Sequence, residues 1–358
     1  METIILFDQD TQHYRQLLYK RFREDFARIG YNLVVVYDLK NNHIQEDPDF
    51  FIGINYSLKN FVAEVKRYKP KIIIQFVWLK YRFLFLFMLY CKLAGIKSIV
   101  WSHGINMQQR TKSWKKYLYY TRQFLGSALI IYTPNEKRFI RASHKKLFIA
   151  NNTLNFRDFP VITATKEELK AKYGFPGKKI ILCVGRLNTH NRKVDLLCDA
   201  FAQIHDDNIV LVVVGTGVTE TQQDRMKEMK NASYLGPIFD PVAVNEIYKM
   251  AELFVMPGGV GLAINHAFYH GLPTIIEDVN HSPEAFYLRD NENGFLFKKG
   301  DATDLKDKIM MLLDDSALYR QFSSKAKQVI ETEGSYENMI RGFMEAVRFV
   351  QHKHKREL

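Results

Sequence analysis

Two segments of the sequence decide the fold: ILCVGRLNTHNRKVDLL at residues 181–197 and MPGGVGLAINHAFYHGLPTII at residues 256–276. The first begins as an apolar strand, leaves it through Gly185 and Arg186, and continues into a helical pattern after Lys193. The second reads as a strand, a glycine loop, a helix and another strand. Because alternating strands and helices form parallel sheets, these segments predict a doubly wound α/β domain with functional residues at the carboxyl ends of its strands.

The same alternation of strands and helices runs through the rest of the chain. Strands are expected near residues 3–7, 32–37, 72–77, 97–101, 128–132, 146–149, 179–184, 209–215, 253–256 and 273–276. Helices are expected near residues 11–29, 58–68, 80–94, 112–125, 135–143, 302–315, 316–333 and 336–352. Residues 151–176 lose strand character, and prolines flank a short charged helix there. The sequence therefore predicts two Rossmann-like domains, residues 1–155 and 177–335, joined by a linker at 156–176.

Charge is distributed unevenly along the 358 residues. Of the 51 Lys and Arg and the 39 Asp and Glu, residues 1–160 hold 26 and 12, a net of +14, which leaves 25 and 27 for the remainder. Between Glu64 and Glu136 there are 13 basic residues and no acidic one. Such a field attracts polyanions, and three classes come into question: an anionic membrane surface, a phosphorylated acceptor and nucleic acid.

Cysteine usage and hydropathy exclude several other classes of protein. Cys91, Cys183 and Cys198 lack the spacing of a zinc site or a disulfide framework, so reduced thiols in a cytosolic protein are expected. The N-terminus reads as a strand and not as a signal peptide. The longest apolar run, residues 83–91, is far shorter than the roughly 20 residues that cross a bilayer. The sequence thus predicts a cytoplasmic protein whose contact with a membrane is peripheral.

The order of elements in residues 181–276 resembles the donor half of retaining family-4 glycosyltransferases (glycosyl transferases group 1), which have the GT-B fold. The E-x7-E motif of that family is degenerate here, because Gly258 and His266 stand at its two glutamate positions. The resemblance implies two Rossmann-like domains facing a cleft, with the last helices crossing back so that helix 336–355 completes the N-terminal domain. It also implies a nucleotide diphosphate sugar as co-substrate, with no metal and no other cofactor.

On the donor side, the resemblance implies that Arg186 and Lys193 clamp the diphosphate. Arg192 is the weaker competitor for the role of the lysine. An arginine fork and a lysine point charge suit a group whose negative charge grows as the sugar leaves. His266 would bind ribose through a ring nitrogen. Further donor-binding candidates are glycine turns and loop residues for phosphate and base, and one acidic residue: Gly185, Gly215, Gly236, Ile238, Gly258, Gly259, Val260, Gly261, Leu262 and Glu284. Structural turns, a packed histidine and a local helix cap explain the same residues equally simply.

On the acceptor side, His103 follows the strand at 97–101, where an imidazole suits proton transfer or sugar binding. The alternative is a histidine in an ordinary turn. The segment 112–124 has aromatic residues at helical spacing with basic residues around them, which is typical of a helix at a membrane interface. The alternative is a helix with its aromatic face in the core. Its membrane- and acceptor-binding candidates are Lys112, Trp114, Lys115, Lys116 and Arg122. No nucleic-acid motif is present, so nucleic acid is not expected as a partner.

These residues lead to one main hypothesis and two alternatives. The main hypothesis is a glycosyltransferase with His103, Arg186 and Lys193 as catalytic residues. Its acceptor would be a lipid-linked glycan, a lipopolysaccharide or another polysaccharide intermediate at the cytosolic face of the membrane. The first alternative is an epimerase or hydrolase of nucleotide sugars on the same fold. The second is a non-catalytic protein that binds nucleotide sugars, for which Gly258 and His266 are the evidence.

Overall fold

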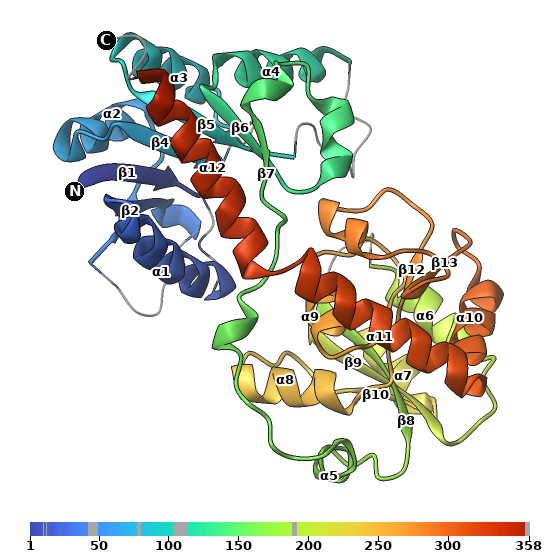
Figure 1. The fold of residues 1–358 in the computed structure, drawn as a ribbon. Coiled ribbons are helices and arrows are strands. Elements are labelled where there is room, and N and C mark those ends of the chain that lie inside the picture. The colour runs from blue at the N-terminus through green and yellow to red at the C-terminus, as the bar shows by residue number, and fades with distance from the viewer. Residues whose placement is uncertain are drawn as a thin grey trace. The chain divides into compact units, whose positions relative to one another are not determined.

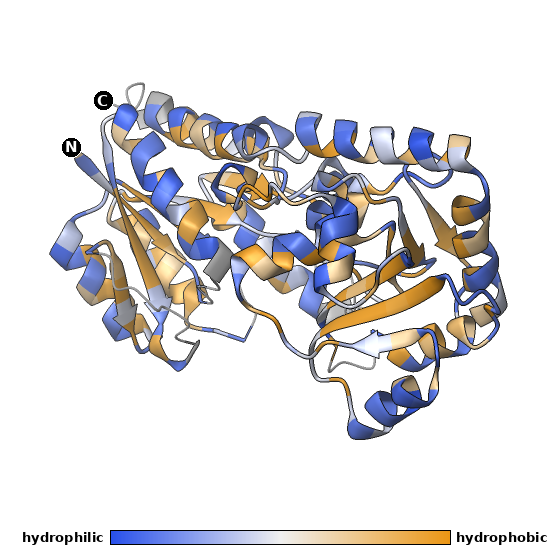
Figure 2. Ribbon diagram, turned by 90° about the horizontal axis from the view of Figure 1, so that it is seen from below, coloured by the Kyte–Doolittle hydropathy of each residue, from blue (hydrophilic) through white to orange (hydrophobic). Residues whose placement is uncertain are grey.

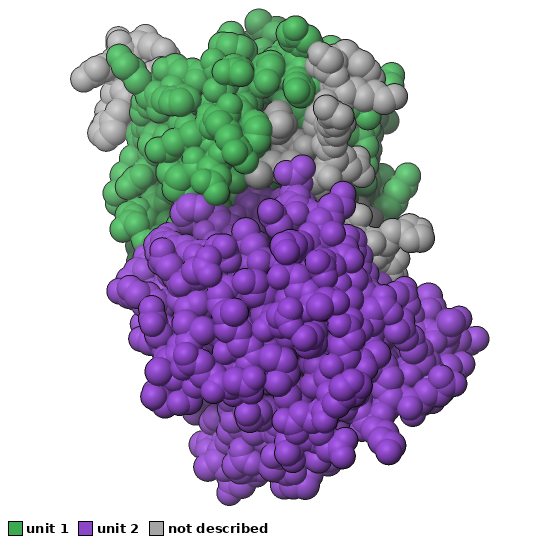
Figure 3. Space-filling view, turned by 90° about the vertical axis from the view of Figure 1, so that its right-hand side faces the viewer, with its two compact units in different colours: residues 1–155, 336–358 green, residues 156–335 purple. Residues whose placement is uncertain are grey.

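The computed structural model describes residues 1–9, 11, 13–41, 49–76, 80–103, 113–187 and 192–354. The chain consists of two compact units (Figure 3). Unit 1 contains residues 1–155 and 336–358, and unit 2 contains residues 156–335. Each unit is an α/β structure built on one parallel sheet, as the sequence predicts.

The sheet of unit 1 has the order β3-β2-β1-β4-β5-β6-β7, and all its pairings are parallel (Figure 1). Its strands are β1 (Glu2–Phe7), β2 (Tyr31–Asp38), β3 (Phe51–Ile54), β4 (Ile72–Phe76), β5 (Lys97–Trp101), β6 (Ala128–Ile131) and β7 (Leu147–Ile149). Its helices are α1 (His13–Arg28), α2 (Leu58–Tyr68), α3 (Leu84–Leu93), α4 (Ser113–Leu125) and α12 (Tyr336–His354), with 3-10 turns η1 (Leu39–Asn41), η2 (Pro134–Phe139) and η3 (His144–Lys146).

The apolar strands of unit 1 are covered on both faces. Along β1, Ile4 and Leu6 pack into a cluster with α1 and α12, whereas Ile5 and Phe7 pack into a second cluster with α2 and α3. This alternation follows from the two-residue period of a strand, and it explains why β1 is an unbroken apolar run. Figure 2 shows the strands of both sheets as mainly hydrophobic.

The sheet of unit 2 has the order β10-β9-β8-β11-β12-β13, again with parallel pairings. Its strands are β8 (Lys179–Arg186), β9 (Ile209–Thr216), β10 (Ala232–Tyr234), β11 (Leu253–Met256), β12 (Thr274–Glu277) and β13 (Gly294–Phe297). Its helices are α5 (Lys166–Lys172), α6 (Val194–Phe201), α7 (Glu220–Glu228), α8 (Pro241–Met250), α9 (Ala263–Tyr269), α10 (Ala302–Asp314) and α11 (Ser316–Thr332), with 3-10 turns η4 (Phe156–Asp158) and η5 (Pro283–Tyr287). The strand order reverses between β8 and β11, where ligands bind in open α/β sheets.

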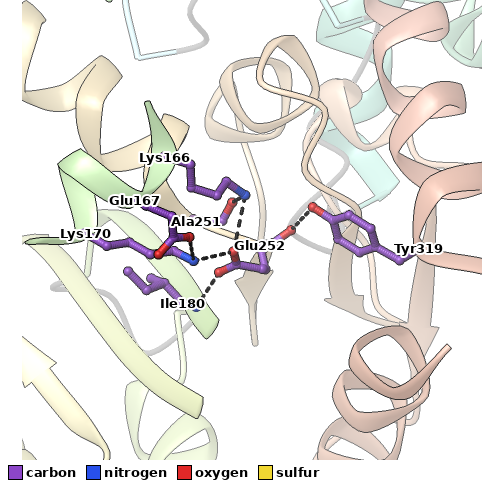
Figure 4. A network of polar contacts seen from close by, with 7 residues as sticks. All are labelled: Lys166, Glu167, Lys170, Ile180, Ala251, Glu252 and Tyr319. Carbon is purple, nitrogen blue, oxygen red and sulfur yellow. Dashed lines mark hydrogen bonds and ion pairs between the residues drawn. The ribbon is translucent and has the colours of Figure 1, made fainter. Parts of the chain in front are cut away.

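The segment 156–176, expected to be a linker, is packed against unit 2. Figure 4 shows how Glu252, which precedes β11, holds α5 in place. Its carboxylate accepts from Lys166 Nζ at 3.3 Å, from Lys170 Nζ at 2.9 Å and from the backbone N–H of Ile180 at 2.5 Å. Because the Lys170 side chain is only 6% exposed, this carboxylate neutralises a buried charge and ties α5 to the sheet. The predicted charged helix is therefore correct, but it belongs to the fold of unit 2.

Cys91, Cys183 and Cys198 are buried and unpaired. Burial raises the pKa of Cys91 and of Cys183 to about 12 and that of Cys198 to about 11, so all three remain neutral thiols at physiological pH.

Within the described ranges, no helix is both long and apolar enough to cross a membrane.

Candidate functional site

Three glycines predicted to bind donor lie together where the central strands of unit 2 end. Gly185 and Gly215 are register partners at the ends of β8 and β9, and the Gly215 N–H donates to Gly236 O at 2.9 Å. Gly215 has φ 138°, and a Cβ there would lie 1.8 Å from the carbonyl oxygen of Gly185. Glycine at 215 is therefore required by the close approach of the two strands. Ile238 follows in the same loop and is half-buried.

Arg186 is the last residue of β8 and is exposed at the point where the strand order reverses. Arg186 interacts electrostatically with a second arginine, Arg192. Burial lowers the pKa of Arg192, the positive charge of Arg186 lowers it further, and Glu284 counteracts this shift. Two arginines and one carboxylate thus share this edge of unit 2. A doubly cationic site of this kind suits a diphosphate.

Lys193 forms a contact that the sequence does not predict. Its backbone is left-handed, with φ 47°, and its ammonium forms an ion pair with Glu277 at the end of β12. The other contact of this carboxylate oxygen is the backbone N–H of Gly300 at 2.7 Å. Glu277 is fully buried, so its charge needs the lysine. This ion pair anchors the start of α6, and the role of Lys193 at the diphosphate stays a prediction.

The loop of Gly258, Gly259, Val260, Gly261 and Leu262 connects β11 to α9. The N–H of Val260 donates to Nδ1 of a buried histidine, His281, at 3.2 Å. The predicted use of the Val260 amide for phosphate is therefore not available in this structure. The remaining candidates for phosphate contacts are the backbone N–H groups of the other loop residues.

The neutral form of His281 is fixed by its two hydrogen bonds. Because Val260 N–H donates to Nδ1, the ring proton lies on Nε2, which donates to Glu277 O at 2.6 Å. Burial lowers the pKa of His281, which keeps the ring neutral. The hydroxyl of Ser282 donates to Val260 O and adds a second attachment of this region to the loop.

His266 is buried in α9 and packed within unit 2. Its ring stacks on Tyr248 with centroids 3.9 Å apart and an interplanar angle of 9°, and it lies 4.7 Å from the ring of Phe159. Its Nε2 lies 3.1 Å from Asn245 Oδ1, and Nε2 of His270 lies 3.2 Å from the same oxygen. Since that oxygen only accepts, both histidines donate to it. Nε2 of His266 is thus engaged, and only Nδ1 remains for the predicted ribose contact.

Burial lowers the pKa of His266 well below its usual range, and the neighbouring His270 lowers it further. Burial also lowers the pKa of His270, to about 4. Both rings are therefore neutral near pH 7, so each keeps one ring nitrogen as a donor and the other as an acceptor. His266, which stands at the second glutamate position of the family motif, is therefore part of the packing between α8 and α9.

Glu284 lies in η5 and is 6% exposed. Its charge acts on Arg192, which places this carboxylate within the same electrostatic cluster as the two arginines. Glu284 is the acidic residue among the predicted donor-binding candidates. A carboxylate beside a half-buried arginine stabilises the charged guanidinium.

In unit 1, His103 lies just beyond β5 among aromatic rings. Its ring centroid is 4.1 Å from that of Tyr132 and 5.5 Å from that of Phe76. Arg15 donates to the hydroxyl of Tyr132 at 3.2 Å and lies 4.5 Å above the ring of Trp101. The carboxyl ends of β4, β5 and β6 thus meet in a cluster with a cation and a titratable ring. Its chemistry suits a polyhydroxylated ligand, and the role of His103 stays a prediction.

The predicted membrane helix is α4. Lys115 and Lys116 are exposed, whereas Lys112 and the side chain of Trp114 lie outside the described residues. Arg122 is buried, which corrects the prediction that it contacts lipid or acceptor.

The contacts of Arg122 lie inside unit 1. Its Nη2 donates to Tyr81 O at 3.3 Å, and its guanidinium lies 4.4 Å above the ring of Phe85. Burial lowers its pKa to about 10. The sequence grouped Arg122 with the membrane- and acceptor-binding candidates, but α4 packs against α3 through this side chain.

Glu277 and His281 were missed by sequence reasoning, although both follow a recognisable apolar strand, TII, within a few residues. A carboxylate and an imidazole at a strand end were a usable signal. The sequence pattern does not reveal their partners. Glu277 forms an ion pair with Lys193, and His281 accepts a hydrogen bond from Val260 in the glycine loop.

Residues 178–315 match the family model described as glycosyl transferases group 1. The poly(ribitol-phosphate) alpha-N-acetylglucosaminyltransferase of Staphylococcus aureus is 27% identical over 172 residues, which cover 46% of this chain and 34% of that protein. The putative glycosyltransferase EpsD of Bacillus subtilis is 25% identical over 254 residues, which cover 65% of each protein. The chain thus spans between 34% and 65% of the length of these two curated relatives.

Solved structures resemble the whole chain. Sucrose-phosphate synthase of Thermosynechococcus elongatus has a TM-score of 0.75 at 16% identity, with 99% of this chain and 100% of that chain covered. Alr3699/HepE of Anabaena, solved in complex with UDP, has a TM-score of 0.74 at 13% identity, with 97% and 100% covered. At these identities the likeness shows the fold. The predicted fold and the predicted resemblance are confirmed: the chain has the GT-B fold, and its residues 178–315 match the family model of the glycosyl transferases group 1.

Proposed function

We propose that this protein is a glycosyltransferase that moves a sugar from a nucleotide diphosphate sugar to an acceptor hydroxyl. The observation that carries the proposal is the pair Arg186 and Arg192 at the point of unit 2 where the strand order reverses, inside the group 1 domain. Ligands of doubly wound sheets bind at such a point. The structure of Alr3699/HepE with UDP supports a nucleoside diphosphate as the ligand for this fold.

The proposed chemistry depends on charge at the leaving group. The diphosphate gains negative charge as the bond to the sugar breaks, and cations already in place stabilise that transition state. Arg186 is exposed and available to the ligand, while Arg192 is half-buried, where its charge is less screened by water. Glu284 helps to keep Arg192 charged. No metal is part of this proposal, because the two guanidinium groups supply the positive charge.

The sugar end of the site has lost one carboxylate, since Gly258 has no side chain to contact a hydroxyl group. We propose that Glu284 takes over part of that role and that His103 is the residue of unit 1 that contacts the sugar. Retention of configuration is proposed from the family resemblance alone. It requires the acceptor to attack from the face that the diphosphate leaves.

The acceptor is proposed to be a lipid-linked glycan, a lipopolysaccharide or another polysaccharide intermediate at the cytosolic face of the membrane. The excess of basic residues in unit 1 supports an acceptor or a surface that carries negative charge. The Staphylococcus aureus relative is a poly(ribitol-phosphate) alpha-N-acetylglucosaminyltransferase, which is consistent with a polyanionic acceptor of this kind.

The proposal predicts that Arg186→Ala lowers donor turnover by about 100-fold, because it removes a charged donor to the developing diphosphate. The measurement is release of the nucleoside diphosphate from each candidate nucleotide sugar in the presence of membrane extract. Arg225→Ala is the matched control, since Arg225 is an arginine of unit 2 that is paired with Asp199 on the surface. Turnover within a few-fold of the wild type for Arg186→Ala would remove the arginine from the mechanism.

A second candidate is a non-catalytic nucleotide-sugar-binding protein, which is favoured by Gly258 and by the packed state of His266. The same assay separates the candidates. Donor turnover that requires the extract supports transfer, whereas turnover without an acceptor supports hydrolysis or epimerisation. Tight binding of a nucleoside diphosphate with no turnover under any condition supports the non-catalytic candidate.

A further inference from the structure

Helices α3 and α4 carry large apolar side chains that are exposed to solvent. On α3, Leu86, Leu89 and Leu93 are 59%, 45% and 81% exposed, and on α4, Tyr117 and Phe124 are 69% and 61% exposed. The two helices are in contact with each other. We call these five residues the α3–α4 face.

The other side of α3 is also apolar. Leu84, Phe87, Met88 and Cys91 are buried in the core of unit 1. A surface helix of a soluble protein usually carries polar residues on its outer side. The outer leucines of α3 recur at helical spacing, so they form a continuous stripe and not isolated exposures. Contact of this stripe with an apolar partner would remove apolar surface from water and would therefore be favourable.

A cavity of about 370 Å³ lies where α3 and α4 end. Lys92 and Lys97 line it from the α3 side, Phe124 lines it from the α4 side, and Lys146 contributes a third ammonium group. Lys146 donates to Gln123 O at 2.9 Å and to Gly126 O at 2.6 Å, so its charge caps the end of α4. Lys92 is exposed, and Lys97 is half-buried in the lining of the same cavity.

Charge and apolar surface coincide here. Lys92 adjoins Leu93, and Lys115 and Lys116 adjoin Tyr117, while no acidic residue occurs anywhere between Glu64 and Glu136. A second copy of this chain would bring two positive faces together, which is unfavourable. Nucleic acid would satisfy the lysines and leave the leucines uncovered. An anionic bilayer satisfies both, because it offers phosphate at the surface and acyl chains below it.

We propose that the α3–α4 face docks on a bilayer that contains anionic phospholipid, with one lipid headgroup phosphate bound in the cavity between Lys92 and Lys97. The exposed leucines and Phe124 enter the apolar boundary of the bilayer beside that headgroup. This assigns a lipid-binding site to the amino ends of β5 and β6, the edge of the sheet opposite His103. The proposal does not depend on the donor chemistry of unit 2, because its readout is binding to vesicles.

The test is co-sedimentation of the full chain with vesicles of phosphatidylcholine alone and of phosphatidylcholine with phosphatidylglycerol. The wild type is expected to bind the mixed vesicles, and added salt should weaken the binding. Leu86→Ser with Leu93→Ser should weaken it by about tenfold or more, through lost apolar burial. Lys92→Ala with Lys97→Ala should weaken it by about tenfold or more, through lost phosphate contacts.

Matched controls lie on the exposed surface of unit 2. Lys227→Ala with Lys230→Ala removes two exposed lysines, and Val161→Ser with Met311→Ser removes two exposed apolar side chains. Both should bind as the wild type does. Equal binding to neutral vesicles, no binding to either kind, or equal losses in the controls would overturn the proposal. So would a wild-type dimer that the leucine variant converts to a monomer, because a second copy would then cover the face.

Discussion

His281 occupies a position between the glycine loop and the end of β12, and it bonds to both. Its Nδ1 accepts from Val260 N–H at 3.2 Å, and its Nε2 donates to Glu277 O at 2.6 Å. Protonation of Nδ1 would remove the acceptor for Val260 and leave a buried N–H unpaired. The lowered pKa of His281 therefore preserves the shape of the loop near neutral pH.

This arrangement predicts a sign for the pH dependence of unfolding. The pKa of His281 is lower in the folded chain than the usual value of about 6.5, so the unfolded chain binds a proton first as the pH falls. The free energy of unfolding should fall as the pH drops below about 6.5. His270, whose folded pKa is about 4, extends this loss towards that pH.

His281→Ala should lower the free energy of unfolding by about 1–3 kcal/mol near neutral pH, because two buried backbone groups lose a partner. It should also flatten part of the pH dependence. Denaturant titrations at about pH 7.5 and about pH 5.5 measure both effects. His205→Ala is the control, since His205 is exposed in the same unit. Identical pH profiles for His281→Ala and the wild type would refute the assignment.

At the scale of elements, α12 shows how a segment distant in sequence completes unit 1. It supplies Phe343 and Val347 to the core cluster and packs on β5, β6 and β7. Gly342 allows this contact. A Cβ at Gly342 would lie 2.1 Å from the carbonyl oxygen of Ile149, so the helix comes closer to β7 than any other residue would permit.

Gly342→Ala is expected to destabilise the protein even though alanine favours a helix by about 1 kcal/mol over glycine. The added methyl group must push α12 away from β7, and overpacking of this kind costs about 1–3 kcal/mol. Arg348→Ala, at an exposed position of the same helix, should change the free energy of unfolding by less than about 0.5 kcal/mol. Denaturant unfolding of the full chain decides the point, and a Gly342→Ala protein as stable as the wild type would contradict the close packing.

At the scale of the whole molecule, apolar runs predict the central strands, because strands covered on both faces have no polar side. The short strands β3, β10 and β13 escape this reasoning. Their four or fewer residues carry little pattern, and they pair at or near the sheet edges. The helical periods near residues 302–352 predict the last three helices closely, since each has a long amphipathic pattern.

The donor residues are less predictable than the fold. Arg186 follows directly from the end of a strand, but the choice between Arg192 and Lys193 depends on a left-handed backbone at 193 that the sequence does not reveal. Arg122 is misplaced for a related reason. Helical spacing predicts which residues of α4 share a face with Arg122. It does not predict which neighbouring element covers that face, and in the structure α3 covers it.

The central claim is that unit 2 holds a nucleoside diphosphate with Arg186 and Arg192, while Lys193 acts through Glu277. Calorimetric titration of UDP and of GDP into the wild type, Arg192→Ala and Lys193→Ala tests it most directly. The wild type should bind one of them, and Arg192→Ala should bind it about tenfold or more weakly, because one charge-assisted contact is lost. Lys193→Ala should retain more affinity than Arg192→Ala and should lose more stability. A larger loss of affinity for Lys193→Ala, or no binding of either nucleotide by the wild type, would contradict the claim.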